Sequence, residues 1–461
     1  MTTLQILFMS LPFVVMLGLG LLLPILLVLC YSRYGFGLAV IAGMFVIEAM
    51  LMYVGGLHVG IRLYYTDFAM LLIAAAAGLR LLFAADFPLR HWAWLLFCLM
   101  FCISLALGLA SFGTAAGVSA RGYFYFIATG LYGMSFPMDA RRVRYTLNVL
   151  VAVAVSLLML TAYRWGVYYT PVTALLPPGG TYNIDGAIRV IKSNEALVLA
   201  QVLVAGLFFA AAARGLLAAR WVSPLLLGVV LALQHRSVWL AALVGTMTRF
   251  LLVRSRASST ASQLFLIAAI VGVTSVPLVF SERLAGVTGQ VQESAQRALQ
   301  GRDTTGERFS NWKSLLQLWY QGGAKSIVIG QSFGADSSRY VETEEGGVKK
   351  ISYFAHNLYV QTLYNTGLIG LAAMLIAFSY VARGLYQMNR EGLGGVETQV
   401  LLVLIATQFA YYVPYGTDYL QSLLFGAALS YVAMHQSSKV TVQKKGDQLH
   451  SSDAHPLGQT A

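Results

Sequence analysis

The chain has 461 residues, of which 58% are hydrophobic and only 11% are charged, and its mean hydropathy is +0.69. Soluble proteins average about 25% charged residues, so this composition excludes a cytosolic enzyme, a disordered protein and a small secreted protein held by disulfide bonds. The net charge of +12 does not indicate nucleic-acid binding, because Lys and Arg lie in short runs between apolar stretches, as in membrane proteins. The composition predicts an all-α polytopic membrane protein.

Apolar stretches long enough to cross a bilayer recur along the chain. A helix needs about 20 apolar residues to cross the hydrocarbon. The first stretch carries Pro12 and Pro24 and fits either a tilted span or a tight hairpin. It lacks a preceding charged region, so we expect a retained span rather than a cleaved signal peptide. In all, the sequence predicts twelve or thirteen spans, with candidates at residues 4–30, 35–56, 64–84, 92–112, 119–136, 145–167, 194–213, 221–235, 237–253, 262–281, 357–383, 398–415 and 418–436.

The basic residues predict the orientation of these spans. Fifteen Lys and Arg residues fall in one set of connections, and six fall in the short connections that alternate with them. Because short cytoplasmic connections carry the excess of positive charge, we expect the first set in the cytoplasm. The polar tail, residues 437–461, is then a cytoplasmic end, and its composition predicts disorder. The six residues of the short connections on the other side are Arg62, Arg121, Arg164, Arg189, Lys192 and Arg236.

Two polar segments fall on the extracytoplasmic side, residues 168–193 and the long hydrophilic stretch 282–355. Chemistry on a polar substrate is expected there, since the cytoplasmic connections are too short to build a site. The chain therefore divides into four parts: an N-terminal helical bundle (1–281), a large extracytoplasmic loop (282–355), C-terminal transmembrane helices (356–436) and the tail.

The large loop contains an amphipathic helix. Residues 305–320 place Phe309, Trp312, Leu315, Leu316 and Trp319 at helical spacing, which predicts one apolar face. Such a helix lies on the membrane surface, roofs a cavity or packs on the bundle.

An arginine follows the short candidate span 221–235, in the sequence Gln234-His235-Arg236-Ser237. This turn is expected at or below the extracytoplasmic interface, where an unpaired Arg is costly. Arg236 then either reaches up to headgroup phosphates or binds an anion, because guanidinium holds phosphate oxygens with two parallel N–H groups.

Histidine 356 and Asn357 stand where the large loop returns to the membrane. A His at a helix start is often a capping residue or one whose hydrogen bonds are already satisfied. His356 is, however, the only His in or beside this loop, and imidazole is the side chain best suited to proton transfer near neutral pH. Both interpretations stay open at this point.

The sequence shows no metal-binding pattern and no nucleotide-binding loop. His-Glu-x-x-His and Walker patterns are absent, so we expect neither a metal, nor ATP, nor another cofactor. Glu342, Glu344 and Glu345 are typical of a solvated turn. The three cysteines lie in apolar stretches and are interpreted as small hydrophobic side chains: Cys30, Cys98 and Cys102.

The segment from Arg308 to Gly370 resembles the O-antigen ligase and polymerase superfamily of bacterial envelope glycosyltransferases. Upstream, Arg236-Ser237 between two short helices resembles the intramembrane arginine turn of that family, and the layout is similar over roughly residues 190–435. Around Arg308 the sequence reads Thr-Gly-Glu-Arg-Phe-Ser-Asn-Trp, with a Glu between Gly and Arg, where Gly-Arg-x-x-x-Trp is commoner, which leaves Arg302 as an alternative. The resemblance is carried by Arg308 with Trp312, Ile-Val-Ile-Gly-Gln-Ser-Phe-Gly at 327–334, His356-Asn357, Tyr359, Gln361 and Gly367-Leu-Ile-Gly370.

This resemblance implies a GT-C-like bundle in the bacterial inner membrane with its active site facing the periplasm. Members transfer an oligosaccharide from a polyprenyl pyrophosphate, here expected to be undecaprenyl pyrophosphate, to an acceptor hydroxyl without ATP or metal. Ligases use lipid A-core as acceptor, polymerases use another lipid-linked repeat unit, and a third branch modifies pilin-type proteins. We expect the ligase reaction, with an O-antigen or exopolysaccharide polymerase as the alternative. The loop from Leu57 to Leu63 lacks the acidic pair usual in cation-dependent GT-C enzymes.

The resemblance also implies roles for individual residues. Arg236 and Arg308 would bind the pyrophosphate, and His356 would accept the proton of the acceptor hydroxyl. Preplaced guanidinium groups stabilise a leaving pyrophosphate more in the transition state than in the ground state. A single base acting opposite the leaving group predicts inversion at the anomeric carbon. Further members of the expected site are Arg189 at the pyrophosphate and, in support, Lys192, Asn194, Asn357, Tyr359 and Gln361.

A membrane transporter is the more distant alternative. It would need charges near the middle of the membrane and usually internal repeats. Only Glu48 and Arg80 lie well inside candidate spans, and no repeat is visible. A scaffold protein would leave the Arg and His residues unexplained, and a flippase would need no base. The expected partners are therefore the lipid-linked glycan donor, a lipid A-core or glycan acceptor and membrane lipids, with no nucleic acid.

Overall fold

The structure is a computed structural model that describes residues 22–51, 56–59, 61–84, 92–170, 176, 182–184, 187–209, 222–252, 304–342, 348–352 and 355–452. The predicted span 262–281 and most of the span 4–30 lie outside these residues. The described part is helical apart from three two-stranded antiparallel hairpins.

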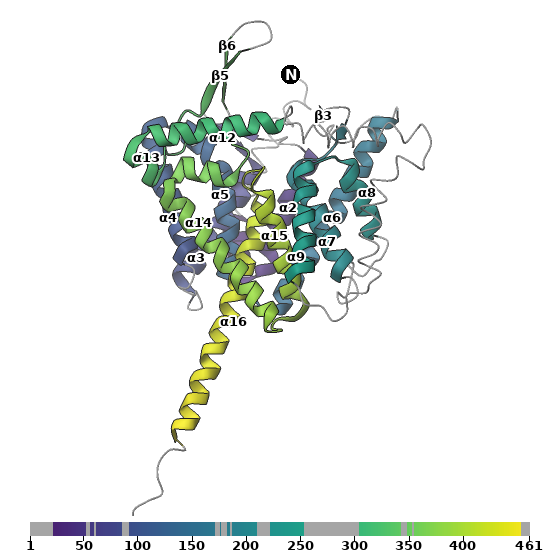
Figure 1. The fold of residues 1–461 in the computed structure, drawn as a ribbon, viewed down its shortest axis with the longest axis vertical. Coiled ribbons are helices and arrows are strands. Elements are labelled where there is room, and N and C mark those ends of the chain that lie inside the picture. The colour runs from purple at the N-terminus through teal and green to yellow at the C-terminus, as the bar shows by residue number, and fades with distance from the viewer. Residues whose placement is uncertain are drawn as a thin grey trace, which may run out of the picture.

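The helices stand side by side as a bundle (Figure 1). Five of the described helices are long and apolar enough to cross a membrane: α2 (Tyr34–Leu51), α3 (Tyr65–Phe83), α4 (Trp92–Phe112), α6 (Ala140–Tyr169) and α14 (Leu358–Arg390). Three other described helices are apolar but shorter, including Leu22–Ser32. This confirms the predicted all-α polytopic membrane protein. The bundle consists of α2 (Tyr34–Leu51), α3 (Tyr65–Phe83), α4 (Trp92–Phe112), α5 (Thr114–Ser135), α6 (Ala140–Tyr169), α7 (Ser193–Phe209), α8 (Val222–Ala232), α9 (Arg236–Leu252), α14 (Leu358–Arg390), α15 (Gly395–Tyr411) and α16 (Tyr419–Ser452).

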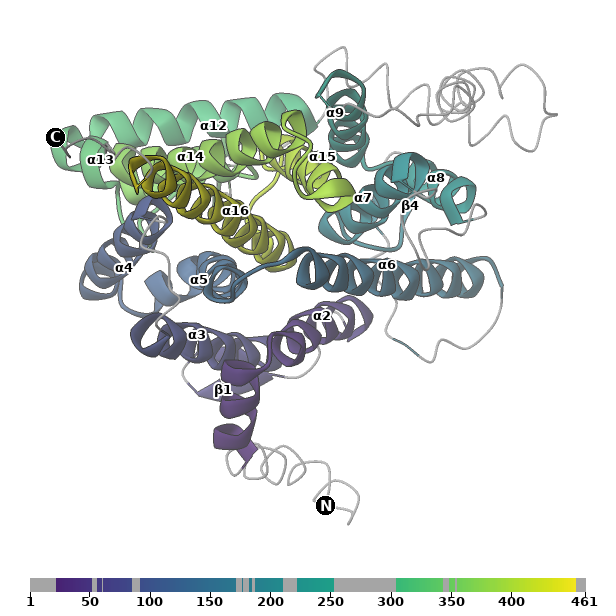
Figure 2. The ribbon, with the colours of Figure 1, turned by 90° about the horizontal axis from the view of Figure 1, so that it is seen from below.

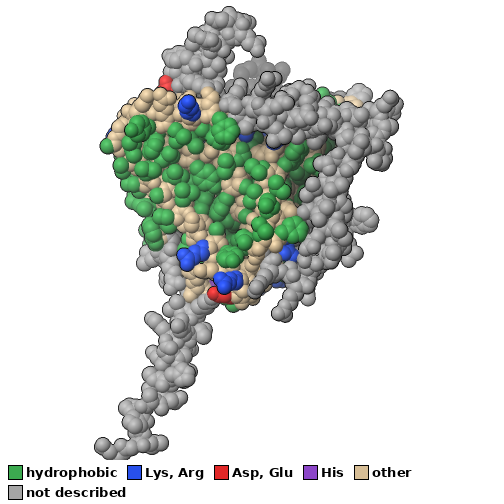
Figure 3. Space-filling view, in the orientation of Figure 1, with side chains coloured by type: hydrophobic (Ala, Val, Ile, Leu, Met, Phe, Trp, Pro, Cys, Tyr) green, Lys and Arg blue, Asp and Glu red, His purple; other side chains and the backbone are tan. Residues whose placement is uncertain are grey.

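An apolar band covers one face of the bundle. Figure 3 shows hydrophobic side chains over the middle height of this face and Lys or Arg side chains near its lower end. Large apolar side chains are exposed on the surfaces of the described helices, among them Leu99, Met159 and Leu251. A soluble protein rarely exposes so large an apolar surface, so the band is the lipid-facing surface.

Helix α16 forms the centre of the bundle. Figure 2 shows it between α5 and α14, and its residues from Tyr419 to Ala433 are almost all buried. Within this core, Gln421 on α16 exchanges hydrogen bonds with Gln201 on α7 at 2.7 and 2.8 Å. Buried amides are retained only where they find such partners, so this pair fixes how α7 and α16 face each other.

The two ionisable residues predicted inside spans have separate roles. Arg80 donates to the carbonyl oxygens of Tyr31 and Ser135 at 2.9 and 3.1 Å and stacks on the ring of Phe136 at 3.7 Å. It therefore ties helix ends together. Glu48 instead lines the cavity described below.

The segments predicted to be extracytoplasmic carry two further helices and three hairpins. Helix α12 (Thr304–Gln321) confirms the predicted amphipathic helix, and α13 (Gly323–Ile329) follows it. Figure 1 shows α12 lying across the end of the bundle. It packs through Leu315 and Trp312 against Ala355 and Tyr364, which agrees with the packing interpretation. The hairpins, which the sequence did not predict, are β1 (Gly56–Val59) with β2 (Ile61–Tyr64), β3 (Tyr182–Ile184) with β4 (Ala187–Arg189), and β5 (Ser338–Glu342) with β6 (Val348–Ser352).

Helix α14 is kinked at Gly367, whose φ of 67° is left-handed. The kink frees two carbonyl oxygens, and both find donors: Gln331 N–H bonds Tyr364 O at 2.8 Å, and Ser104 Oγ bonds Asn365 O at 2.7 Å. The backbone of Val328 lies so close that a Cβ at Gly367 would be 2.4 Å from it. The loop after α13 therefore fits directly into the kink.

Helix α16 also continues beyond the predicted end of its span. It runs to Ser452, into the polar tail. This stretch contains no helix-terminating proline before Pro456. Figure 1 shows this part extending below the bundle.

Candidate active site

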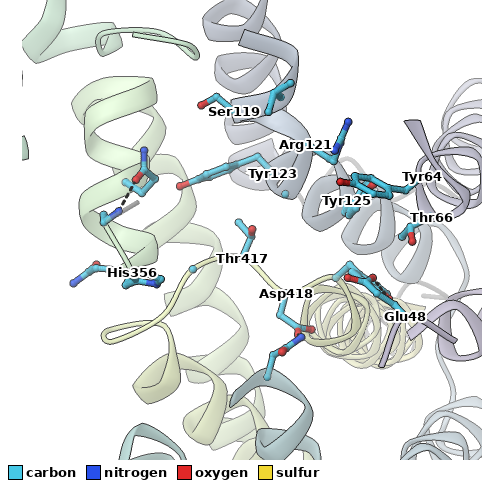
Figure 4. Close-up of a pocket in the computed structure, with 18 residues that line it drawn as sticks. Glu48, Tyr64, Thr66, Ser119, Arg121, Tyr123, Tyr125, His356, Thr417 and Asp418 are labelled. Carbon is cyan, nitrogen blue, oxygen red and sulfur yellow. Dashed lines mark hydrogen bonds between the residues drawn. The ribbon is translucent and has the colours of Figure 1, made fainter. Parts of the chain in front are cut away.

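A cavity of about 730 Å³ opens at the end of the bundle where α12 lies. Its walls come from the C-terminal part of α2, the start of α3 and the N-terminal ends of α5, α7, α14 and α16. Four predicted site residues line it: His356, Asn357, Gln361 and Asn194. Figure 4 shows His356 at one end of this cavity.

His356 is held in a strained backbone conformation just before α14. Its φ is 44°, a value that non-glycine residues rarely adopt. The next residue, Asn357, caps α14 by accepting a 3.0 Å hydrogen bond from Val360 N–H. Leu358 N–H donates to the carbonyl oxygens of Tyr412 and Tyr415 at 3.0 and 2.9 Å. These bonds fix the backbone on the C-terminal side of His356, whose own side chain is exposed.

Arg308 lies beside His356, and Tyr415 contacts both. The guanidinium of Arg308 lies over the Tyr415 ring at 5.1 Å, and the His356 ring meets the same ring edge-on at 6.3 Å. Partial loss of water around the imidazole and the positive charge of Arg308 lower the pKa of His356 below its ordinary value of 6.5. The imidazole is therefore neutral at neutral pH and able to accept a proton.

Arg189 and Arg236 lie together at a second place, the turn between α8 and α9. Arg236 is the first residue of α9, and the positive end of a helix dipole favours an anion. Arg189 Nη2 donates to Gln234 O at 3.1 Å. The predicted interruption between two short helices is therefore present, and Gln234 makes the turn with a φ of 51°.

His235 in the same turn is buried and makes a 3.1 Å hydrogen bond from Nε2 to Ile191 O. Burial and the neighbouring charge of Arg189 lower its pKa to about 4. A neutral, buried and bonded imidazole holds the turn in place and is not available to a substrate.

A pair of stacked tyrosines connects the two groups of arginines. Tyr415 stacks on Tyr411 with ring centroids 4.8 Å apart, and the Tyr411 hydroxyl hydrogen-bonds the side chain of Ser193. Ser193 in turn lies 3.3 Å from the hydroxyl of Ser237, next to Arg236. The three predicted arginines do not line the cavity themselves. Arg308 lies over Tyr415, Arg236 follows the turn that ends next to Ser237, and Arg189 bonds that turn at Gln234.

The supporting residues differ in their surroundings. Gln361 Oε1 accepts from Ala355 N–H at 3.1 Å, which helps fix the loop before His356. Tyr359 points away from the cavity, because its hydroxyl donates to Phe409 O at 3.0 Å on α15. Tyr359 therefore connects α14 to α15 in this structure. Lys192 Nζ lies 3.8 Å from Glu48 Oε1.

Sequence reasoning missed the wall at the far end of the cavity. Glu48, Tyr125, Asp418 and Tyr419 line it. Burial raises the pKa of Asp418 to about 6, against the effect of hydrogen bonds from Gln421 N–H and Asn194. The one available signal was the polar sequence Tyr-Gly-Thr-Asp-Tyr at 415–419 between two apolar spans.

A protein holds a metal ion with a cluster of ligand side chains. Within the described ranges, no three His, Cys, Asp or Glu side chains gather in a way that could hold a metal ion.

Comparison with known proteins agrees with this geometry. Residues 221–375 match the family model described as O-antigen ligase, and no curated protein matched the chain. The matched segment contains Arg236, Arg308 and His356 together with the kink of α14. It thus includes Arg236 and Arg308 and the exposed histidine of the cavity, but not Arg189. The match over residues 221–375 confirms the resemblance to the O-antigen ligase and polymerase superfamily found in the sequence.

Proposed function

We propose that this protein is a ligase-type glycosyltransferase. It transfers an oligo- or polysaccharide from undecaprenyl pyrophosphate to a hydroxyl group of lipid A-core, at the periplasmic face of the bacterial inner membrane, and uses neither ATP nor a metal ion. The family match supports the coarser statement, a membrane glycosyltransferase of the ligase and polymerase type.

The observation that carries the proposal is the position of His356. It lies in the matched segment, lines the cavity and is kept neutral by its surroundings. A sugar hydroxyl is a weak nucleophile, and a positioned general base accelerates its attack by roughly 10²–10⁴-fold. The proton of the acceptor hydroxyl passes to His356 as its oxygen bonds the anomeric carbon.

The arginines serve the leaving group. As the bond between the anomeric carbon and the pyrophosphate oxygen breaks, its electron pair stays on that oxygen, and negative charge grows there. Arg308 beside His356 and Arg236 at the start of α9 are suited to hold this charge. Attack from the side opposite the leaving group inverts the anomeric carbon.

A reconstituted assay tests the proposal. Purified protein in liposomes receives an undecaprenyl-pyrophosphate-linked oligosaccharide, with or without lipid A-core, and products are separated on a gel. A single shift that requires lipid A-core supports the ligase, whereas a ladder from donor alone means a polymerase. No product in either case contradicts both reactions. Addition of EDTA should leave the rate unchanged, and strong inhibition would contradict metal independence.

Replacement of the proposed base gives the sharper test. We expect His356→Ala to lower the transfer rate by at least about 10²-fold while the protein still inserts and folds. His435→Ala is the matched control, because His435 on α16 only bonds the Tyr431 carbonyl, outside the cavity. Turnover of His356→Ala equal to that of the control would end the general-base proposal.

A further inference from the structure

The cavity has a second wall that the matched segment does not supply. Glu48, Tyr125, Asn194, Asp418 and Tyr419 line it, and all lie outside residues 221–375. We call these five residues the distal wall. Figure 4 shows Glu48 and Tyr125 across the cavity from His356, with Asp418 between them.

Glu48 has hydrogen-bonding capacity left for a ligand. A carboxylate accepts about four hydrogen bonds. Oε2 of Glu48 accepts one from the Tyr419 hydroxyl at 3.2 Å, and Oε1 lies 3.8 Å from Lys192 Nζ, beyond hydrogen-bond distance. The side chain is partly accessible, with 17% of its surface exposed. It therefore offers acceptor positions to donors that enter the cavity.

The rest of the distal wall is rigid and has the same character. Asp418 accepts from Asn194 Nδ2 at 3.0 Å and from Gln421 N–H at 2.9 Å. The rings of Tyr125 and Tyr419 meet edge-on with centroids 6.1 Å apart, and the Tyr125 hydroxyl donates to Asp67 at 2.6 Å. Carboxylates held among tyrosines suit a sugar, whose hydroxyl groups donate hydrogen bonds and whose ring packs on aromatic surfaces.

Charge and reaction geometry select which substrate lies there. At the distal wall, the cations Lys192 and Arg121 are paired with Glu48 and Asp67 at 3.8 and 3.2 Å, so they offer a pyrophosphate little attraction. Arg308 at the His356 end attracts one. In an inverting displacement the acceptor stands on the side of the anomeric carbon opposite the leaving group. The end of the cavity away from Arg308 is therefore the place for the acceptor.

We infer that the distal wall is the acceptor subsite: it binds an uncharged sugar through hydrogen bonds from its hydroxyl groups to Glu48, and so directs one hydroxyl to His356. This inference rests on the proposed function and adds to it the place and chemistry of acceptor recognition. It also assigns specificity to residues outside the matched family segment.

Kinetics of Glu48→Gln test the inference, because Gln keeps the shape of Glu but removes its charge. With protein in liposomes and saturating lipid-linked donor, lipid A-core is titrated, and then donor is titrated at saturating lipid A-core. Loss of a charge-assisted hydrogen bond should raise the acceptor KM about 10-fold and leave the donor KM within about twofold. Ile47→Leu, at the lipid-exposed neighbouring position, is the matched control with unchanged constants.

A second variant guards against misfolding of Glu48→Gln. Tyr419→Phe keeps the ring but removes the hydroxyl that orients Glu48, so the acceptor KM should rise by a smaller factor. An unchanged acceptor KM in both variants, or a rise in the donor KM instead, overturns the inference.

Binding of lipid A-core to the protein in nanodiscs, without donor, separates the two proposals. If wild type transfers no glycan but binds lipid A-core, and Glu48→Gln binds it about 10-fold more weakly, the proposed function fails and the subsite stands. If wild type transfers glycan and both variants bind and react as wild type does, the subsite fails and the function stands.

Discussion

The two histidines near the cavity show how surroundings decide the role of one residue type. His235 is buried, bonded to Ile191 and deprotonated by burial and by Arg189. His356 is exposed and has a charge, Arg308, close to its ring. Only the second can exchange a proton with a ligand. The two histidines differ in burial and in hydrogen bonding, and neither property can be read from the residue type alone.

The lowered pKa of His356 predicts the pH dependence of the reaction. The base must be neutral, so kcat/KM should rise as pH increases through the lowered pKa and be level above 6.5, the ordinary value for His. Arg308→Met removes one cause of the lowered pKa, the positive charge beside His356. The pKa of His356 should then rise, so the acid limb of the profile, where kcat/KM falls with decreasing pH, should move to higher pH. The reaction should also be slower. A pH–rate profile of both proteins measures the shift.

Asp418→Asn is the control for that profile, because Asp418 has a pKa of about 6 and lies in the same cavity. We expect its acid limb to remain where the wild-type limb is. An acid limb that disappears in Asp418→Asn would assign the titration to Asp418 and contradict the role of His356.

Arg236 should not be replaceable by Lys. A Lys ammonium keeps the positive charge but not the planar pair of N–H groups that fits phosphate oxygens. We expect Arg236→Lys to lower kcat by roughly 10²-fold, as measured in the liposome assay, while thermal unfolding in detergent stays close to wild type. Near-full activity would remove Arg236 from the site.

Local sequence predicted part of the site and missed the rest for a physical reason. Arg236, Arg308 and His356 stand in short stretches with recognisable neighbours. Tyr419 and Glu48, by contrast, are 371 residues apart in the chain and 3.2 Å apart in space. No spacing along the sequence indicates such a contact, because it depends on how α2 and α16 pack. Glu48 was visible in the sequence only as an acid inside an apolar span.

At the scale of elements, two motifs of the sequence turn out to be one contact. The Ile-Gly-Gln-Ser-Phe-Gly loop and the Gly-Leu-Ile-Gly helix meet where Gln331 N–H bonds Tyr364 O. Gly330 has a φ of 85°, and a Cβ there would lie 2.4 Å from the backbone of Asn365. The glycines are needed because two backbones touch. This contact sets the path of α14 and with it the position of His356.

Gly367→Ala tests that contact. Both the left-handed φ and the 2.4 Å approach to Val328 oppose a side chain, so we expect a loss of stability of about 2 kcal/mol, seen as a lower unfolding temperature in detergent. Gly78→Ala on α3 is the control, since a Cβ there meets nothing within 4 Å. Equal unfolding temperatures for the two variants would show that the kink tolerates a side chain.

Periodicity and composition predicted the helices better than the connections between them. The apolar spacing from Phe309 to Trp319 gave α12 correctly, because one face of a helix repeats at a fixed interval. The three hairpins were missed, since their strands have only three to five residues and leave little pattern to recognise. The kink of α14 was also missed, because Gly367 alone does not show that another backbone lies against it.

On the scale of the whole molecule, the two ends of the bundle differ in charge and in structure. The lower end in Figure 3 carries basic side chains, and there Arg144 on α6 pairs with Glu397 on α15. The other end holds the cavity, α12 and the hairpins. The excess of positive charge predicts that the first end faces the cytoplasm and that the cavity opens into the periplasm.

Cysteine labelling of cells tests this orientation. In protein whose three native cysteines are replaced, Tyr320→Cys on α12 should react with a membrane-impermeant maleimide added to spheroplasts, because Tyr320 is 70% exposed. Arg141→Cys, at the start of α6, should react only after the membrane is permeabilised. The opposite pattern would invert the assignment.

The hydrogen bonds from Leu358 N–H to Tyr412 and Tyr415 also bear on how the protein is made. A chain emerges from the ribosome starting at its N-terminus, so His356 is synthesised before Tyr412 and Tyr415 exist. The backbone that fixes His356 is therefore incomplete until α15 has inserted and the start of α16 has followed it. A nascent chain stopped earlier holds its histidine and its arginines without the arrangement of the proposed site, so we expect the proposed activity to require α15 and the start of α16.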